Sequence, residues 1–200
     1  MKKPVIFIDF GGVYFRSSYP IIQKKFAKKF RIPYKKLLNV YMFNWISHAT
    51  GKMSAKTYWE YISNKLNLTE IQTNRFKKAN FHYSIPNPGM LRLIRKLKKK
   101  YTVAALSSII VGWVEFLEKK YKISNHFHEN HYSYDHRVDK PSEKFFLSAA
   151  KKMKTKPEDC IVVDDLKPFL AAVRKTGART ILFKNAKQLQ RDLKKMGVDV

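Results

Sequence analysis

The chain has 200 residues, of which 44% are hydrophobic, so it can enclose a core as one domain with a modest insertion. Its one cysteine, Cys160, excludes a disulfide within the chain and fits a reducing compartment. The formal net charge of +26 would attract nucleic acid, but the lysines are spread over most of the sequence without an arginine-rich tract, so a solvated surface is favoured over a nucleic-acid site.

The first predicted element is a buried strand at Val5–Ile8, a short apolar run that ends at Asp9. The run is too short for a signal sequence or a membrane span, so we expect a cytoplasmic protein that does not enter a membrane. Gly11 and Gly12 then indicate a tight turn. A carboxylate at a strand tip is well placed for nucleophilic attack, and glycine amides can approach a phosphate. An aspartate before two glycines is also ordinary turn chemistry, so both interpretations stay open here.

Apolar residues at helical spacing follow over residues 19–81. Ser54 is expected to cap one of these helices. We predict that residues 16–85 form a helical cap inserted after the first strand, and that residues 1–15 and 86–200 form the core. Aromatic stripes at this spacing indicate helix packing and not a cofactor site.

Strands and helices alternate in the rest of the chain, which is typical of a parallel, doubly wound sheet. We predict an α/β, Rossmann-like fold with a five-stranded parallel sheet in the order 3-2-1-4-5. The cap would lie over the carboxyl ends of the strands, where such sheets bind ligands. The remaining strands are predicted at 102–106, 128–132, 161–163 and 180–183, and the helices at 89–99, 111–121, 142–153, 168–176 and 186–195.

Polar residues follow two of these strands or precede a helix. Ser107 and Ser108 come after the strand 102–106, where a hydroxyl can bond a phosphate oxygen or cap the next helix. Lys140 precedes a predicted helix and could offset negative charge at a site, although one lysine has little weight in so basic a chain.

Asp164 and Asp165 follow the buried strand 161–163 directly. Adjacent carboxylates repel each other, and burial favours their neutralisation, so they need a compensating cation. Together with Asp9 they would form an oxygen-rich cluster suited to Mg²⁺. Capping of the following helix is the simpler alternative.

Read in order, these residues resemble the four motifs of the haloacid dehalogenase-like superfamily, and the resemblance covers essentially the whole chain. The details are similar to the branch that contains sugar-phosphate phosphatases and the N-terminal phosphatase domain of epoxide hydrolases. The matching segments are 6–13, 105–107, 138–141 and 162–165 with Ala171, Ala172 and Gly177, and in the cap 31–33, 51–54 with Trp59, and 86–88.

The resemblance implies a Mg²⁺-dependent phosphomonoesterase that acts on a small phosphorylated metabolite through an aspartyl-phosphate, with Asp9 as the nucleophile. The implied catalytic residues are Asp9, Ser107 and Lys140. The implied substrate-binding residues are Gly12, Ser107, Ser108 and Lys140. The implied Mg²⁺ ligands are Asp9, the Gly11 carbonyl and Asp165, with Asp164 in support.

The sequence departs from the family pattern at several positions. Gly11 stands where family phosphatases usually carry the aspartate that serves as general acid and base, and Ser108 where asparagine is common. Leu166 and Phe169 replace polar residues after the acidic pair. An alternative is therefore a catalytically impaired relative that binds a polyanion or protein through its basic surface. A haloacid dehalogenase is a third alternative, but it usually has a Tyr-Gly-Thr turn after the nucleophile.

Overall fold

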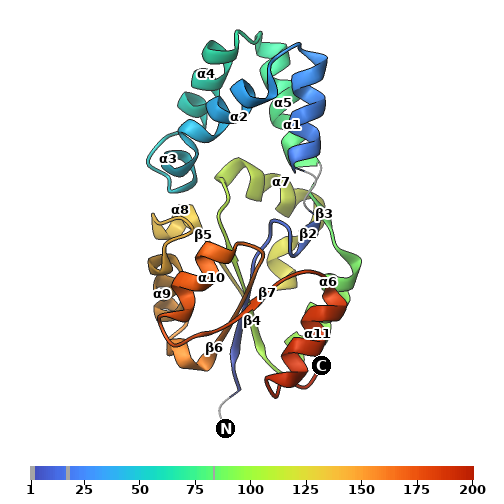
Figure 1. Ribbon diagram of the computed structural model, residues 1–200, viewed down its shortest axis with the longest axis vertical. Coiled ribbons are helices and arrows are strands. Elements are labelled where there is room, and N and C mark those ends of the chain that lie inside the picture. The colour runs from blue at the N-terminus through green and yellow to red at the C-terminus, as the bar shows by residue number, and fades with distance from the viewer. Residues whose placement is uncertain (1–2, 17–18, 83) are drawn as a thin grey trace.

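The computed structural model of the protein describes residues 3–16, 19–82 and 84–200. A sheet lies at the centre of its lower half, with a group of helices above it (Figure 1). The strands of this sheet are β1 (Val5–Ile8), β4 (Thr102–Ser107), β5 (Glu129–Tyr132), β6 (Cys160–Asp164) and β7 (Arg179–Leu182). All neighbours are parallel, in the order β5-β4-β1-β6-β7. Counted along the chain this is 3-2-1-4-5, so the predicted doubly wound α/β fold is confirmed.

Helices cover both faces of the sheet. Successive residues of a strand point to opposite faces, and in β1 the residues on both faces are apolar, so each face packs against its own layer of helices. Ile6 and Ile8 of β1 belong to a core shared with α6, α7 and α11, whereas Phe7 belongs to a core shared with α9 and α10. The helices of this half are α6 (Pro88–Lys98), α7 (Val111–Tyr121), α8 (Ser133–His136), α9 (Glu143–Lys152), α10 (Lys167–Arg174) and α11 (Ala186–Lys195), with short 3-10 helices η1 (Ile123–His126) and η2 (Pro157–Asp159).

Two strands run one residue further than predicted. Ser107 is the last residue of β4 and pairs in register with Tyr132, and Asp164 is the last residue of β6 and pairs with Leu182. Backbone pairing therefore continues past each apolar run and carries a polar side chain to the strand tip.

In the part of the chain that is described, the upper half consists of five helices, which we call the helical block. These are α1 (Tyr19–Lys29), α2 (Tyr34–Phe43), α3 (Trp45–Ala49), α4 (Ala55–Leu66) and α5 (Glu70–His82). The block has its own core, in which Phe26 stacks on Phe76 at a ring separation of 4.2 Å. Ser54 caps α4 as predicted, since its hydroxyl accepts a hydrogen bond of 3.1 Å from the Thr57 N–H.

A two-stranded antiparallel ribbon, β2 (Phe15–Arg16) and β3 (Ile85–Pro86), joins the helical block to the sheet. Two residues per strand are too few to show a period in the sequence, so this ribbon was not predicted. The division into core and cap stays a prediction, and residues 1–2, 17–18 and 83 of those segments lie outside the described residues. No helix within the described ranges is long and apolar enough to span a membrane.

Candidate active site

The carboxyl ends of three neighbouring strands bring the predicted polar residues to one edge of the sheet. Asp9 follows β1, Ser107 ends β4 and Asp164 ends β6. The Asp9 N–H donates a hydrogen bond of 3.0 Å to the Val163 carbonyl, which continues the pairing of β1 with β6. Asp9 and Asp164 therefore lie close together. The carboxyl ends of β1 and β6, which carry them, face the helical block (Figure 1).

Asp9, Asp164 and Asp165 form an acidic cluster, in which each offers one carboxylate oxygen within 4.8 Å of the others. Asp9 and Asp164 are buried, and Asp165 is exposed. Burial raises the pKa of Asp9 to about 7, as do Asp164 and Asp165, while Lys140 opposes the rise. Burial and Asp164 also raise the pKa of Asp165. Three hard oxygen donors that repel one another fit a divalent cation such as Mg²⁺.

Lys140 reaches the centre of this cluster from the loop before α9. Its Nζ donates to Asp9 Oδ1 at 2.5 Å and to Asp164 Oδ2 at 2.6 Å, and its side chain is 6% exposed. Burial alone would lower the pKa of Lys140, but the two carboxylates outweigh it and raise the pKa. Lys140 is therefore the fixed countercharge of Asp9 and Asp164.

The loop that carries Lys140 is held by Ser108, which was a predicted site residue, and by Asp139, which was not. The Lys140 N–H donates to Asp139 Oδ1 at 2.8 Å and to Ser108 Oγ at 3.4 Å, and the Lys140–Pro141 bond is cis. Burial raises the pKa of Asp139, although its bonds to Ser108 and Lys140 oppose the rise. Its position next to Lys140 in the third motif was the only available signal for Asp139.

Leu166 and Phe169, which replace the usual polar residues after the acidic pair, both contact the cluster or Lys140. The Leu166 N–H donates to Asp164 Oδ1 at 2.7 Å, so the backbone holds this carboxylate while the side chain is 39% exposed. The Phe169 ring is fully buried, and its centre lies 5.1 Å from Lys140 Nζ, within range of a cation–π contact. Phe169 therefore packs against the lysine that orders the cluster.

The two glycines of the first turn differ in what they permit. Gly12 has φ +76°, and a Cβ there would lie 2.0 Å from Asp165 Oδ2, so the carboxylate occupies the space of the missing side chain. Gly11 does not have a positive φ, and a Cβ on it would meet only Asp9 Oδ2, at 3.9 Å. Gly12 is thus required for the position of Asp165, whereas Gly11 can accept a side chain.

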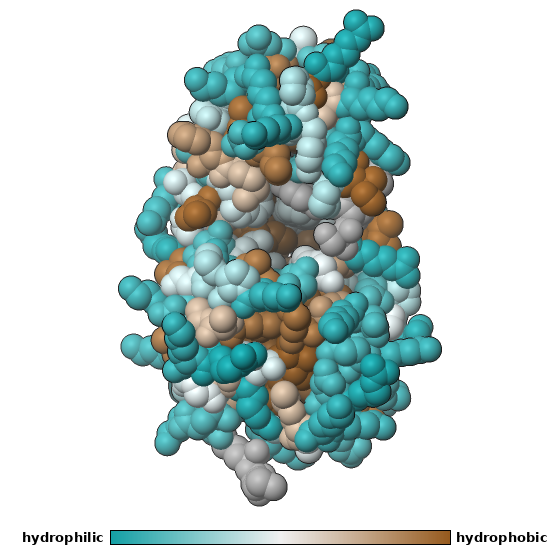
Figure 2. Space-filling model, in the orientation of Figure 1, coloured by the Kyte–Doolittle hydropathy of each residue, from teal (hydrophilic) through white to brown (hydrophobic). Residues whose placement is uncertain are grey.

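A cavity of about 460 Å³ lies over the cluster, between the sheet edge and the helical block. The space-filling view shows the molecule hollowed between its two halves (Figure 2). From the sheet side the cavity is lined by Gly11, Gly12, Ser107, Ser108 and Asp165. The structure therefore brings Asp9, Lys140, Asp164 and Asp165 into one cluster and places the other predicted residues at the cavity beside it.

Comparison with known proteins gives one family. A model of the haloacid dehalogenase-like hydrolase family matches residues 5–167. No curated protein matches the chain.

Solved structures share the fold at low sequence identity. A predicted HAD-like family hydrolase from Porphyromonas gingivalis has a TM-score of 0.79 at 17% identity, with all of both chains covered. The HAD family enzyme BT-2542 from Bacteroides thetaiotaomicron, solved with magnesium and inorganic phosphate, has a TM-score of 0.75 at 18% identity, covering 92% of this chain and 95% of its own. The L-2-haloacid dehalogenase PA0810 has a TM-score of 0.66 at 17% identity, covering 90% and 83%. At such identities the likeness shows the fold alone.

Proposed function

Because the chain belongs to the haloacid dehalogenase-like hydrolase family, we propose that it is a phosphomonoesterase that uses Mg²⁺ and acts through an aspartyl-phosphate on Asp9. The observation that carries the proposal is the acidic cluster at the strand tips, with Lys140 bonded to both Asp9 and Asp164. In this proposal, Asp9 as nucleophile, Lys140 as countercharge and the carboxylates as cation ligands would be arranged before a substrate binds.

The acidic cluster is the proposed Mg²⁺ site. Asp9 and Asp165 would hold the ion together with the Gly11 carbonyl, and Asp164 would support them. When bound, Mg²⁺ neutralises the charge that gathers between the nucleophile and the phosphate. The magnesium and phosphate in the BT-2542 structure support this proposal for a protein of the same fold.

Asp9 is the nucleophile in the proposed reaction. Its ionised carboxylate attacks phosphorus, the bond from phosphorus to the alcohol oxygen breaks, and water then hydrolyses the aspartyl-phosphate. Lys140 favours the ionised form, because its ammonium lies 2.5 Å from Asp9 Oδ1. The Ser107 and Ser108 hydroxyls, the Gly12 N–H and Lys140 would hold the phosphate oxygens.

As far as the structure describes the chain, the site lacks an obvious side chain to protonate the leaving alcohol. Gly11 has no side chain to protonate it. Among the described residues that line the cavity, Asp165 is the only carboxylic acid, and none is a histidine. General acid catalysis typically contributes a factor of about 10² to 10⁴, so turnover will depend strongly on the acidity of the alcohol.

The test is phosphate release from a panel of phosphomonoesters with and without Mg²⁺. Asp9→Asn should abolish the Mg²⁺-dependent activity, since an amide is a poor nucleophile and a weaker cation ligand. Asp199→Asn is the matched control, because it makes the same change at an exposed carboxylate near the C-terminus. Equal activity in wild type and Asp9→Asn would refute the assignment of Asp9 as the nucleophile.

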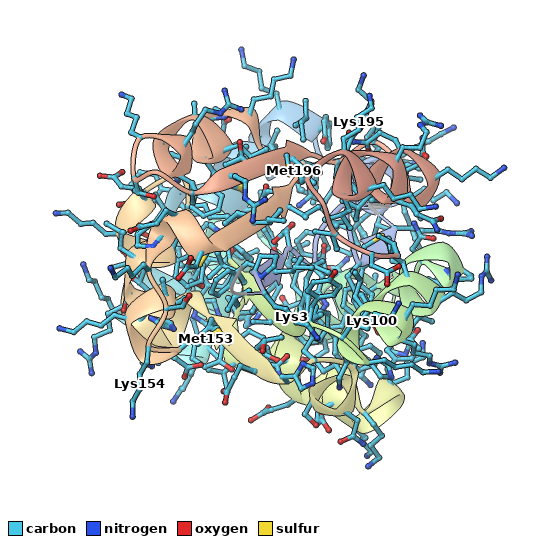
Figure 3. The ribbon with its side chains drawn as sticks, turned by 90° about the horizontal axis from the view of Figure 1, so that it is seen from below. Lys3, Lys100, Met153, Lys154, Lys195 and Met196 are labelled. Carbon is cyan, nitrogen blue, oxygen red and sulfur yellow. The ribbon has the colours of Figure 1, made fainter. Side chains whose placement is uncertain are left out.

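Two alternatives predict other outcomes. The fold is shared with a haloacid dehalogenase, so chloride release from a 2-haloacid would point to that chemistry. A binding protein would show polyanion affinity without hydrolysis. The basic side chains point outward around the whole outline of the molecule seen from below, which argues against one binding face (Figure 3). A cytoplasmic location stays a prediction.

A further inference from the structure

We infer that the alcohol released from the substrate is an apolar phenol, so that the substrate is a small aryl phosphate whose ring lies in the cavity. This inference rests on the proposed function. Two independent features lead to it, the chemistry of the cavity walls and the missing proton donor.

The cavity walls are mainly large apolar side chains. The helical block contributes Ile22, Met42 and Trp45, and the sheet half contributes Trp113 and Leu166, among others. Its volume of about 460 Å³ is within the usual range for small-ligand sites, about 300–1,000 Å³, and suits a ring system of one or two rings.

The far wall offers few polar groups to a ligand. The Trp113 indole N–H donates to Ser84 Oγ at 2.8 Å, and the Asn80 amide N–H donates to the Phe76 carbonyl at 2.8 Å. Asn80 Oδ1 has no partner among the described residues, but this atom is buried. Arg16 is exposed, so water can solvate its guanidinium. A sugar buried here would leave several hydroxyls without partners, and each such loss lowers affinity by about tenfold or more. An aromatic ring would instead bury apolar surface against the two indoles.

The lack of a general acid at position 11 also favours aryl phosphates as substrates. A phenol has a pKa of about 10, like the tyrosine side chain, and leaves as a phenolate without prior protonation. An aliphatic alcohol is far less acidic and needs a proton, which no side chain at position 11 can supply. Aryl phosphates therefore match both the walls and the catalytic residues.

The first experiment compares kcat/KM of the Mg²⁺-loaded enzyme for 1-naphthyl phosphate, cyclohexyl phosphate and glucose 6-phosphate. We expect naphthyl phosphate to exceed glucose 6-phosphate by at least about 100-fold. Cyclohexyl phosphate separates the two causes, because its ring is apolar but its alcohol is not acidic: it should share the low KM and lack the high kcat. A glucose 6-phosphate value equal to or above the naphthyl value would overturn the inference.

The second experiment uses a matched pair of surface variants. Met42 is 46% exposed and lines the cavity, whereas Ile46 is 61% exposed, four residues away, and is not among the lining residues. Met42→Ser should raise KM for naphthyl phosphate about three- to tenfold through lost apolar contact, with little change for glucose 6-phosphate. Ile46→Ser should change neither value. An unchanged naphthyl KM in Met42→Ser would count against this binding position.

A binding measurement separates this inference from the proposed function. Trp45 and Trp113 line the cavity, so 1-naphthylmethylphosphonate, which cannot be hydrolysed, should quench tryptophan fluorescence, and Met42→Ser should weaken the effect. If no ester is hydrolysed but this quenching is seen, the proposed activity fails and the aryl site stands. If sugar phosphates are hydrolysed and no quenching is seen, the activity stands and the aryl class is wrong.

Discussion

Gly12→Ala should strongly weaken Mg²⁺ binding, whereas Gly11→Ala should not. A Cβ on Gly12 would lie 2.0 Å from Asp165 Oδ2 and 2.8 Å from its carboxyl carbon, where ordinary contacts begin at 3.4 Å. The Asp165 carboxylate must therefore move by more than about 1 Å, out of the acidic cluster. Forcing a non-glycine residue to φ +76° costs about 1–2 kcal/mol of stability in addition.

The magnitude follows from the loss of one of the three carboxylates. Disturbing even a residue that only supports a ligand weakens metal affinity by about 10- to 100-fold, so Gly12→Ala should lose at least that much. Gly11→Ala meets its nearest atom, Asp9 Oδ2, at 3.9 Å and should keep the wild-type affinity within about twofold.

Titration calorimetry with Mg²⁺ measures both variants, and thermal unfolding shows whether each is folded. Wild-type affinity in a folded Gly12→Ala protein would show that Asp165 does not bind the ion from this position. An equal loss in Gly11→Ala would show that any change in the turn disturbs the site.

Three further results are expected. Gly11→Asp should raise the turnover of alkyl phosphates by up to about 100-fold in steady-state assays while aryl turnover changes little, because it restores a proton donor where the backbone accepts a side chain; a uniform loss on both substrates would contradict this. Burial raises the pKa of Asp9 to about 7, and Mg²⁺ competes with that proton, so calorimetric affinity should fall roughly tenfold per pH unit below about pH 7; a flat profile between about pH 5 and about pH 8 would contradict a Mg²⁺ site that contains Asp9 with this raised pKa. Burial lowers the pKa of His131 and of His136 to about 4, so the unfolded state binds more protons between about pH 6.5 and 4. Denaturant unfolding should therefore show stability falling as the pH drops through that window, by at most about 3 kcal/mol for each histidine, and His131→Gln should flatten the fall.

The sheet could be predicted because its signals are local. Apolar runs such as Val5–Ile8 alternate with helical spacing, and the rules of chain connection leave few strand orders for such a pattern. The ends of β4 and β6 were missed by one residue because Ser107 and Asp164 are polar. Their strand conformation comes from pairing with neighbouring strands and not from their own side chains.

The site was only partly predictable, because several of its properties depend on residues far apart in the sequence. In a chain with 41 basic residues nothing local distinguishes Lys140, whose burial depends on Asp9, 131 residues away, and on Asp164. Trp45 belongs to an aromatic stripe that was interpreted as helix packing, yet it lines the cavity, and so does Met42. Their apposition to the sheet edge is a tertiary contact that helical spacing does not encode.

The central claim is that Asp9 forms a covalent bond to phosphorus. The most direct measurement mixes the Mg²⁺-loaded enzyme with radiolabelled phenyl phosphate, quenches in acid within the first turnover and maps the labelled peptide. We predict label on the peptide that contains Asp9, removable by hydroxylamine as expected for an acyl phosphate, and none in Asp9→Asn. Phosphate release by an enzyme that never carries label on that peptide, or label that persists in Asp9→Asn, would contradict the account.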